Sequence, residues 1–240
     1  MTLPRIAVVL PAHNEEALLE ATVRQVAEGL KERGETYELI VVENGSSDRT
    51  PALAAALSAD DPAIRVVALP EADYGRAIAA GLASATAPVV VLFDVDYFDL
   101  GFLDRAVSLV RAGDAGIVLA SKRAPGSVDR RPMLRRLLTA VFTVAMRAAL
   151  RVPVSDAHGM KALSAAVCRD VASRCRMGGS LFDVELVARA ARSGIGIGEL
   201  PVEVKELRPP RTPVLRRSLE GAVGLVRLRM LLRREARGGP

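Results

Sequence analysis

The sequence contains no tryptophan, and aromatic residues make up only 3% of its 240 residues. A core made from this composition has to be built mainly from alanine, valine and leucine. The shortage of aromatic rings also disfavours a surface that binds nucleic acid by stacking bases. Cysteine is equally rare, with Cys168 and Cys175 as the only two. This count excludes a disulfide framework and a zinc site with four cysteine ligands, and it fits a reducing compartment.

The sequence also lacks an uncharged apolar run of about 18 residues, so we expect no helix that spans a membrane. Residues 1–5 lead directly into an apolar strand, and we expect no signal peptide. Hydrophobic residues nevertheless make up 50% of the chain, which is enough for a sizeable core. A chain of this length predicts one large α/β domain, or one domain with an appendage.

Excess charge of one sign is missing from most of the chain and concentrated at one end. The net charge is +5, but residues 205–237 contain ten Lys or Arg and three Asp or Glu, a local charge of +7. The preceding 204 residues therefore sum to −2. A near-neutral body with a basic tail indicates an anionic partner surface, either lipid headgroups or nucleic acid. An arginine-rich helix exposed to water would carry the same charges.

The most informative stretch is an apolar run that leads into two carboxylates. Residues 89–93 are apolar on both faces, which predicts a buried parallel strand. Asp94 and Asp96 follow at its carboxyl end, where ligands collect in open α/β sheets. In an extended strand these two side chains point the same way. Paired carboxylates suit Mg²⁺ or Mn²⁺ that carries phosphates. The alternative is a capped strand end followed by an acidic turn.

Apolar strands alternate with helical patterns through the first hundred residues. The expected strands cover residues 5–10, 37–42, 63–69 and 89–93, and the expected helices cover residues 15–33, 51–59 and 73–85. This alternation predicts a doubly wound, mainly parallel sheet with right-handed crossovers. Residues 1–100 would form its nucleotide-binding half.

Polar turns follow the first two strands. Pro11 cannot pair in a central strand, so we expect it to mark the exit of the first one. Asn14 is a suitable N-cap for the next helix. Asn44 follows the second strand and offers both a donor and an acceptor, which suits the edge of a nucleobase. An ordinary capped loop explains the second turn equally well.

The second half, residues 101–208, is less regular. The pattern indicates helices over residues 103–112, 133–151, 164–175 and 185–192, and strands over residues 115–120 and 195–204. Lys122 and Arg123 follow the first of these strands and can hold phosphate. The apolar helix 133–151 has arginines at both ends, so it fits either the core or a membrane interface.

The basic tail, residues 209–240, predicts an amphipathic C-terminal helix from residue 214 to about 237. Its apolar stripe could dock on the body, on lipid or on a partner subunit. The residues of this stripe are Leu215, Leu219, Val223, Val226 and Met230.

Six short motifs occur in an order that resembles the family 2 glycosyltransferases, and within them the dolichyl/polyprenyl-phosphate sugar synthases. The motifs are VVLPAHNE at 8–15, IVVENGSSDRT at 40–50, FDVD at 93–96, DAHGMK at 156–161, FDVEL at 182–186 and ELPV at 199–202. The sequence departs from the family pattern at three places, one of which is Tyr74-Gly75-Arg76, where the family has a G-K-G-like turn. His13 stands where the family has a tyrosine, and Glu43-Asn44 stands where it has two aspartates. The donor's sugar and base are therefore left open.

The resemblance implies a GT-A fold over residues 1–208, a UDP- or GDP-hexose donor and a Mg²⁺ or Mn²⁺ ion. By position, it places a nucleoside pocket at Pro11, His13, Glu15, Val42 and Asn44, the metal and diphosphate at Asp94, Val95 and Asp96, and phosphate contacts at Arg123 and Arg211. Asp94 and Asp96 would be the metal ligands.

The resulting hypothesis is metal-dependent transfer of a hexose, with inversion, to a polyprenyl phosphate. A phosphate acceptor is already a dianion at neutral pH, because its second pKa is about 6, so arginines such as Arg123 would position it. A hydroxyl acceptor would require a base, for which Asp156 is the first candidate. Asp96, Asp156 and Arg123 are thus the expected catalytic residues.

The polyprenyl acceptor implies an enzyme of the cytoplasm, peripheral on the inner face of an anionic membrane, and a homo-oligomer is compatible with the sequence. Two alternatives stay open. One is a family 2 enzyme with a soluble or cell-wall acceptor. The other is a non-catalytic module that binds nucleotides or nucleic acid. Asp94 and Asp96 would repel a nucleic-acid backbone, so we expect no nucleic-acid partner.

Overall fold

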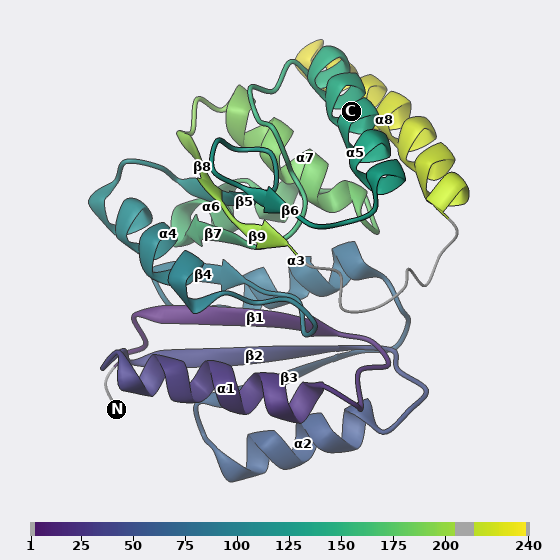
Figure 1. The fold of residues 1–240 in the computed structure, drawn as a ribbon. Helices are drawn as coiled ribbons and strands as arrows, with labels where there is room; N and C mark the ends of the chain where they lie inside the picture. The colour runs from purple at the N-terminus through teal and green to yellow at the C-terminus, as the bar shows by residue number, and fades with distance from the viewer. Residues whose placement is uncertain (1–2, 205–213, 239–240) are drawn as a thin grey trace.

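The computed structural model of the protein describes residues 3–204 and 214–238 and has an α/β fold (Figure 1). A seven-stranded sheet has the strand order β3-β2-β1-β4-β7-β5-β8. Its strands are β1 (Ile6–Ala12), β2 (Tyr37–Asn44), β3 (Ile64–Leu69), β4 (Val89–Leu92), β5 (Ile117–Ser121), β7 (Lys161–Ser164) and β8 (Ile197–Pro201). Only β7 runs antiparallel to its neighbours in this described sheet. The mainly parallel sheet is therefore confirmed.

Helices cover both faces of this sheet and make a three-layer arrangement (Figure 1). One face carries α1 (Leu19–Glu32), α2 (Thr50–Asp60) and α4 (Leu100–Ala112). The other carries α3 (Tyr74–Ser84), α5 (Met133–Leu150), α6 (Ala165–Asp170), the 3₁₀ turn η1 (Ala172–Arg174), α7 (Leu181–Arg192) and α8 (Val214–Ala236). Two short parallel strands, β6 (Val128–Asp129) and β9 (Glu203–Val204), form a separate ladder.

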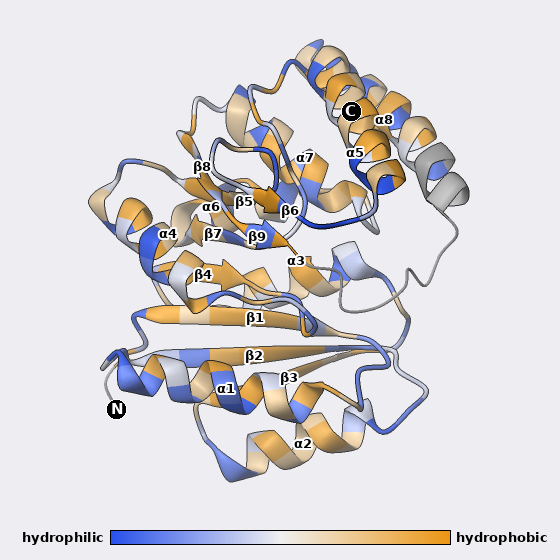
Figure 2. Cartoon of the chain, viewed as in Figure 1, coloured by the Kyte–Doolittle hydropathy of each residue, from blue (hydrophilic) through white to orange (hydrophobic). Residues whose placement is uncertain are grey.

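Strands β1 and β4 are apolar on both faces, and helices cover each face. In β1, Val8 and Leu10 pack with the layer of α1, whereas Ala7 and Val9 pack with the layer of α3. Figure 2 shows the central strands in the colours of hydrophobic residues. Alternate side chains of a strand point to opposite faces, so an unbroken apolar run is what a doubly covered strand requires.

The first strand is longer than expected, because Pro11 lies inside β1 and not after it. The Val9 carbonyl accepts a hydrogen bond from the Phe93 amide at 3.0 Å, on the side of β4. The backbone groups of successive residues point to alternate edges of a strand, so the backbone nitrogen of Pro11 points toward β4, as the Val9 carbonyl does. The β4 ladder ends at the Val9–Leu92 pair, so the proline removes no ladder hydrogen bond.

The predicted N-cap role of Asn14 is wrong. Helix α1 begins at Leu19, and its N-cap residue, Leu18, makes no side-chain capping bond. Asn14 has a φ of 54°, in the left-handed region that asparagine tolerates. Its side chain accepts a hydrogen bond from the Ser47 amide at 2.8 Å. Asn14 therefore ties the loop after β1 to the loop after β2.

The least predictable strand is β7, which the sequence analysis did not anticipate. It enters the sheet between β4 and β5 and pairs with both, through Leu92–Lys161 and Leu119–Lys161 among others. Because β7 takes residues 161–164, the expected helix over residues 164–175 is reduced to α6 and η1. The expected final strand over residues 195–204 is divided into β8 and β9.

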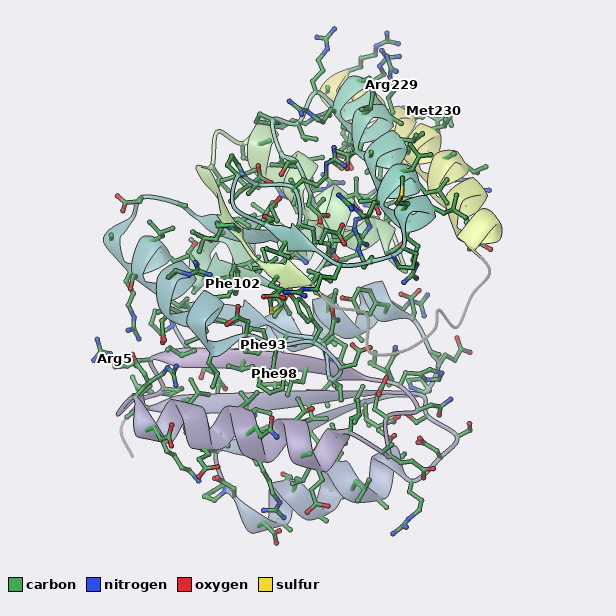
Figure 3. All side chains as sticks on the ribbon, viewed as in Figure 1. Arg5, Phe93, Phe98, Phe102, Arg229 and Met230 are labelled. Carbon is green, nitrogen blue, oxygen red and sulfur yellow. The ribbon has the colours of Figure 1, made fainter. Side chains whose placement is uncertain are left out.

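Helices α5 and α8 pack against each other at one end of the molecule (Figure 1). Among the α8 residues whose burial is described, the large side chains of Leu225, Leu228 and Leu232 are buried against the body. Val223, Val226 and Met230, which belong to the predicted docking stripe, are exposed, and Figure 3 shows Met230 on the outer part of α8. These three residues of the stripe therefore do not dock on the body, and the side chains of its other two residues, Leu215 and Leu219, lie outside the described part of the chain. The expected boundary at residues 208–209 lies outside the described residues.

Helix α5 also turns much of its apolar surface outward. Thr143, Met146 and Leu150 are buried, whereas five large hydrophobic side chains are exposed. The exposed five are Met133, Leu134, Leu137, Val141 and Val144. Interpreting this helix purely as core is thus wrong. Within the described residues, no helix is both long and apolar enough to span a membrane.

Candidate active site

A cavity of about 410 Å³ lies where the carboxyl end of β4 meets the residues that follow β5 and precede β7. Because β7 is antiparallel, its first residues reach the edge of the sheet at which β4 and β5 end. The amino-terminal ends of α3 and α7 complete the wall. The cavity is lined by Tyr74, Asp94, Lys122, His158, Gly159, Ser180 and Asp183.

Asp94 lies in this wall, but not on an extended strand. Its backbone exchanges two hydrogen bonds with Tyr97, at 3.2 and 3.1 Å, so residues 94–97 form a tight turn. Asp96 is exposed on that turn, and Val95 is buried. The expectation that Asp94 and Asp96 point the same way because they share a strand is therefore wrong. The turn keeps both carboxylates at the carboxyl end of β4. The preceding Phe93 packs 6.1 Å from Phe98, measured between ring centroids (Figure 3).

The Asp94 carboxylate is held from one side by a tyrosine. The Tyr74 hydroxyl donates to Asp94 Oδ1 at 3.0 Å. Burial raises the pKa of Asp94, while the Tyr74 hydrogen bond and the positive charge of Lys161 act in the opposite direction. A cation at the site would favour the same ionised form.

A buried ion pair joins Lys161 to the cavity residue Asp183. The Lys161 Nζ donates to Asp183 Oδ1 at 2.9 Å and to the Gly159 carbonyl at 2.7 Å, and both side chains are 1% exposed. Within the described part of the chain, Asp183 Oδ2 is a buried oxygen without a hydrogen-bond partner. Since Asp183 also lines the cavity, this oxygen is available to a bound ligand.

Asp183 was not among the expected site residues, although it lies in the FDVEL motif. The signal that could have found it is a carboxylate in the first turn of α7, between the apolar residues Phe182 and Val184. That position is compatible with a simple helix-dipole role. Lys161 reaches Asp183 only because its strand, β7, pairs with β4 and β5.

Asp156 lies behind the cavity wall and is 3% exposed. Lys122 Nζ donates to its Oδ2 at 3.3 Å, and the His158 amide donates to its Oδ1 at 3.1 Å. Burial acts to raise the pKa of Asp156, but the charge of Lys122 and the hydrogen bonds from Lys122 and from the His158 amide outweigh burial and hold the pKa below its usual value. Asp156 is therefore an ionised partner of Lys122 and a weak proton acceptor.

The Ser155–Asp156 backbone is fixed from the sheet by Glu199. One oxygen of Glu199 accepts from the Ser155 amide at 2.9 Å, from the Ser155 hydroxyl at 2.7 Å and from the Asp156 amide at 3.3 Å. Glu199 belongs to β8 and to the ELPV motif. This motif thus contributes a structural support for the segment that carries Asp156.

Of the two neighbouring cations expected to hold phosphate, Lys122 lines the cavity and Arg123 does not. The Arg123 side chain is exposed, and its backbone amide donates to the Ser121 hydroxyl at 3.1 Å. Arg211, the second expected phosphate contact, lies outside the described residues.

His158 is the histidine that lines the cavity, and histidine is the side chain that normally titrates near neutral pH. Its ring centroid lies 5.6 Å from that of Phe142, on α5. Burial lowers the pKa of His158, and the charges around it act in both directions. Asp183 and Asp156 raise the pKa, and Lys122 and Lys161 lower it. The imidazole is therefore neutral at neutral pH.

The residues that we expect to bind the nucleoside lie at the carboxyl ends of β1 and β2 and in the loop after β1. His13 Nδ1 donates to the Asn44 carbonyl at 2.8 Å, and the Asn44 side-chain oxygen accepts from the Asp73 amide at 2.9 Å. Glu15 joins the same loops, because its amide donates to the Thr50 hydroxyl at 2.8 Å. The structure thus brings His13, Glu15 and Asn44 together.

The side chains of Val42 and Val95 are buried in the core. They can therefore contribute only backbone atoms to a ligand. Pro11 is partly exposed at the end of β1.

The donor atoms at the site fit a divalent cation of the Mg²⁺ type. Among the described residues, no group of three or more His, Cys, Asp or Glu side chains could hold a metal by itself. Asp94 and Asp96 supply hard carboxylate oxygens near a charged cavity. Mg²⁺ usually takes one or two carboxylates and fills its other positions with water and substrate phosphates. The two aspartates match that requirement.

The chain is similar in sequence to known glycosyltransferases. Residues 7–171 match the family model described as glycosyl transferase family 2. Over 203 residues the chain is 31% identical to the glycosyltransferase AglD of Haloferax volcanii, covering 82% of this chain but only 32% of AglD. It is 32% identical to an uncharacterized glycosyltransferase of Mycobacterium tuberculosis, covering 82% and 84% of the two chains. It is 26% identical to the dolichyl-phosphate beta-glucosyltransferase ALG5A of Trichomonas vaginalis, covering 84% and 66%.

Solved structures show the same fold. Glucosyl-3-phosphoglycerate synthase from Mycobacterium tuberculosis, in complex with Mn²⁺, UDP and glucosyl-3-phosphoglycerate, superimposes with a TM-score of 0.70 at 24% identity. The match covers 94% of this chain and 80% of the synthase. The same synthase with Mg²⁺ and UDP gives a TM-score of 0.69.

Proposed function

Because this chain belongs to glycosyl transferase family 2 and is a glycosyltransferase, we propose that it moves a hexose from a UDP or GDP donor to a polyprenyl phosphate, with inversion. The observation that carries this proposal is a cavity lined both by a carboxylate suited to a metal ion, Asp94, and by a cation suited to phosphate, Lys122. These two groups match the two anionic substrates. The names of the dolichyl-phosphate glucosyltransferase relatives support the acceptor class.

On the donor side, Asp94 and Asp96 would hold Mg²⁺ or Mn²⁺. Such an ion acts as a Lewis acid that neutralises charge on the departing nucleoside diphosphate. The loops that carry His13 and Asn44 would bind the nucleoside, since hydrogen bonds already join them.

On the acceptor side, Lys122 would position the phosphate. A phosphate oxygen forms the new bond to the anomeric carbon while the bond to the donor diphosphate breaks. No proton has to be removed, because the acceptor phosphate is already ionised at neutral pH. Positioning then supplies much of the rate. A reaction that needs no base fits the state of Asp156, whose carboxylate accepts a hydrogen bond from Lys122 and is poorly suited to act as a base.

The exposed apolar face of α5 supports an acceptor that is held in a membrane. Leu137, Val141 and Val144 are exposed on that face, while Phe142 on the inner face contacts the cavity residue His158. One helix thus joins an apolar surface to the wall of the site. Exposed apolar side chains grouped in this way are typical of an interaction surface.

Charge favours a lipid surface as the partner of this face. Arg136 and Arg147 are exposed on α5, and Arg227, Arg233 and Arg234 are exposed on α8. A helix with an apolar face and flanking arginines is suited to the headgroup region of an anionic membrane. We therefore place the protein peripherally on the inner face of a membrane, in contact with its acceptor.

Transfer is tested with the purified chain, Mn²⁺ or Mg²⁺, a panel of UDP- and GDP-hexoses, and undecaprenyl or dolichyl phosphate in vesicles. We expect a metal-dependent, lipid-linked sugar. The Asp96→Ala variant should lose transfer, whereas Asp60→Ala, which removes an exposed carboxylate on α2, should retain it. Transfer only to water-soluble acceptors would overturn the acceptor class, and full activity of Asp96→Ala would overturn the metal role.

The membrane face is tested separately by vesicle co-sedimentation. The double variant Leu137→Glu/Val141→Glu should lose binding to anionic vesicles. Ala52→Glu/Ala56→Glu is the matched control, because it adds the same charges at the same spacing on exposed positions of α2. Equal binding by the two double variants would show that α5 does not contact the membrane.

A further inference from the structure

The Tyr74 side chain contacts Asp94, the first residue of the tight turn formed by residues 94–97. Its hydroxyl lies 3.0 Å from Asp94 Oδ1 and donates to it. Both residues line the cavity. They come from different elements, because Tyr74 begins α3 and Asp94 follows β4. Their contact therefore depends on how α3 is seated.

The start of α3 is seated by contacts from two other parts of the fold. Asp73 caps the helix by accepting from the Arg76 amide at 3.0 Å, and it also accepts from the Gly179 amide at 2.9 Å. The Asn44 side chain in turn accepts from the Asp73 amide. These bonds join the start of α3 to the end of β2 and to the segment before α7.

Gly75 shows how little room α3 has to move. A Cβ atom at this position would lie 2.8 Å from the Phe182 Cβ and 2.9 Å from the Gly179 amide nitrogen. The helix is thus in direct contact with the backbone that leads into α7. Tyr74 is held between this contact and its bond to Asp94, so its hydroxyl has a fixed position.

Asp94 is equally restricted along its backbone. The turn with Tyr97 holds its amide and its carbonyl. What remains is rotation of the carboxylate about its side-chain bonds. A hydrogen bond to Oδ1 selects one orientation and leaves Oδ2 as the oxygen for a further ligand.

We propose that Tyr74 is a positioning residue, which orients the Asp94 carboxylate so that its second oxygen can bind the divalent cation that would carry the donor diphosphate. The inference rests on the proposed function, because it concerns the same metal site. Hydrogen-bond partners of metal ligands set the orientation of those ligands, and their loss typically costs about 10- to 100-fold in metal affinity.

The test is the affinity of the full chain for Mn²⁺, measured by isothermal titration calorimetry with and without UDP. The Tyr74→Phe variant keeps the ring and loses the hydroxyl, so its Mn²⁺ affinity should fall about 10- to 100-fold. The chain has three tyrosines, and Tyr37→Phe is the matched control. Its hydroxyl lies 3.5 Å from Asp61 Oδ2, at the start of β2. The control should bind Mn²⁺ as the unaltered chain does.

A positioning role also predicts a specific kinetic result. Tyr74→Phe should raise the Mn²⁺ concentration needed for half-maximal transfer, and saturating Mn²⁺ should restore most of the turnover. Its thermal midpoint in EDTA should stay close to that of the unaltered chain, which separates positioning from folding. Equal Mn²⁺ affinity of Tyr74→Phe and Tyr37→Phe would overturn this inference alone. Absence of Mn²⁺ binding by the unaltered chain would overturn both this inference and the metal role in the proposed function.

Discussion

Lys161 and Asp183 put two opposite charges into the core beside the cavity, each only 1% exposed. Such a pair is costly to bury, but breaking it is costlier, because one charge is then left without a partner. Asp183 Oδ2 already lacks a hydrogen-bond partner among the described residues. The loss of Lys161 would leave the whole carboxylate without charge compensation.

We therefore expect Lys161→Met to lower the free energy of unfolding by about 3–5 kcal/mol. Urea unfolding followed by circular dichroism measures it. Lys31→Met removes the exposed pair with Asp61, at 2.9 Å, and should cost about 1 kcal/mol or less. If the two variants lose similar stability, the buried pair does not have the role given to it here.

His158 leads to a prediction about pH at the same scale. Burial lowers its folded-state pKa, and the unfolded-state pKa is about 6.5. As the pH falls below about 6.5, the unfolded state takes up a proton that the folded state does not. Stability contributed by the neutral imidazole is therefore complete above this pH and decreases as the pH falls toward the folded pKa.

His158→Gln should remove this part of the pH dependence. We expect the stability difference between the unaltered chain and the variant to shrink between pH 7.5 and about 5.5, a window below which carboxyl groups begin to titrate. Chemical unfolding at several pH values measures the difference. A difference that stays constant across the window would show that His158 is not buried in its neutral form.

At the scale of elements, α3 contacts the start of α7, and both helices contribute residues to the cavity wall. Gly75 makes this approach possible, since a Cβ would come within 2.8 Å of Phe182. Gly75→Ala should therefore lower the free energy of unfolding by about 1–3 kcal/mol, because overpacking forces the backbones apart.

Gly198→Ala provides the comparison for this glycine. A Cβ there would lie 3.6 Å from the Val118 Cγ2, which is ordinary contact. We expect this variant to keep its stability within about 1 kcal/mol. Thermal unfolding of both variants compares them. Equal stabilities would mean that α3 and α7 can separate at little cost.

At the scale of the whole molecule, the uneven charge predicts how the protein meets a membrane. Residues 205–237 carry a local +7 within a net +5, and exposed arginines lie on α5 and α8. Each basic residue near an anionic surface contributes about 1 kcal/mol. This attraction weakens with salt, because the screening length falls from about 10 Å at 0.1 M to about 3 Å at 1 M.

We expect binding to anionic vesicles to fall steeply between these salt concentrations, and binding to neutral vesicles to be weak at both. A residual, salt-independent part should remain, because the exposed apolar face of α5 does not depend on charge. Co-sedimentation with vesicles of both compositions measures the two parts. Salt-independent binding to anionic vesicles would show that the arginines do not contact the surface.

The sequence alone determined the alternation of strands and helices and the edge of the sheet at which the site lies. Unbroken apolar runs such as residues 89–93 can be satisfied only by a strand covered on both faces. Parallel strands place their carboxyl ends at one edge, so the polar residues after them had to meet there. This is why Asp94, Lys122, His13 and Asn44 were found near that edge without any structure.

Only the tertiary structure decided which of these groups work together. The pairing of Lys161 with Asp183, and of Lys122 with Asp156, depends on β7 entering between β4 and β5. That pairing joins residues distant in sequence, and a short strand with a charged first residue has no local signal for it. The tight turn at Asp94 likewise follows from backbone bonds to Tyr97 that no alternation of side chains reveals.

Helix α8 shows the same limit most clearly. Leu225, Leu228 and Leu232 are buried, while Val223, Val226 and Met230 are exposed, and both sets have the spacing i, i+3, i+7. Helical periodicity identifies an apolar stripe but cannot choose between two stripes of equal spacing. The choice was made by the surface against which the helix packs. The sequence therefore determines most of the strands and helices and the edge at which they meet, and packing between distant segments determines which side chains pair.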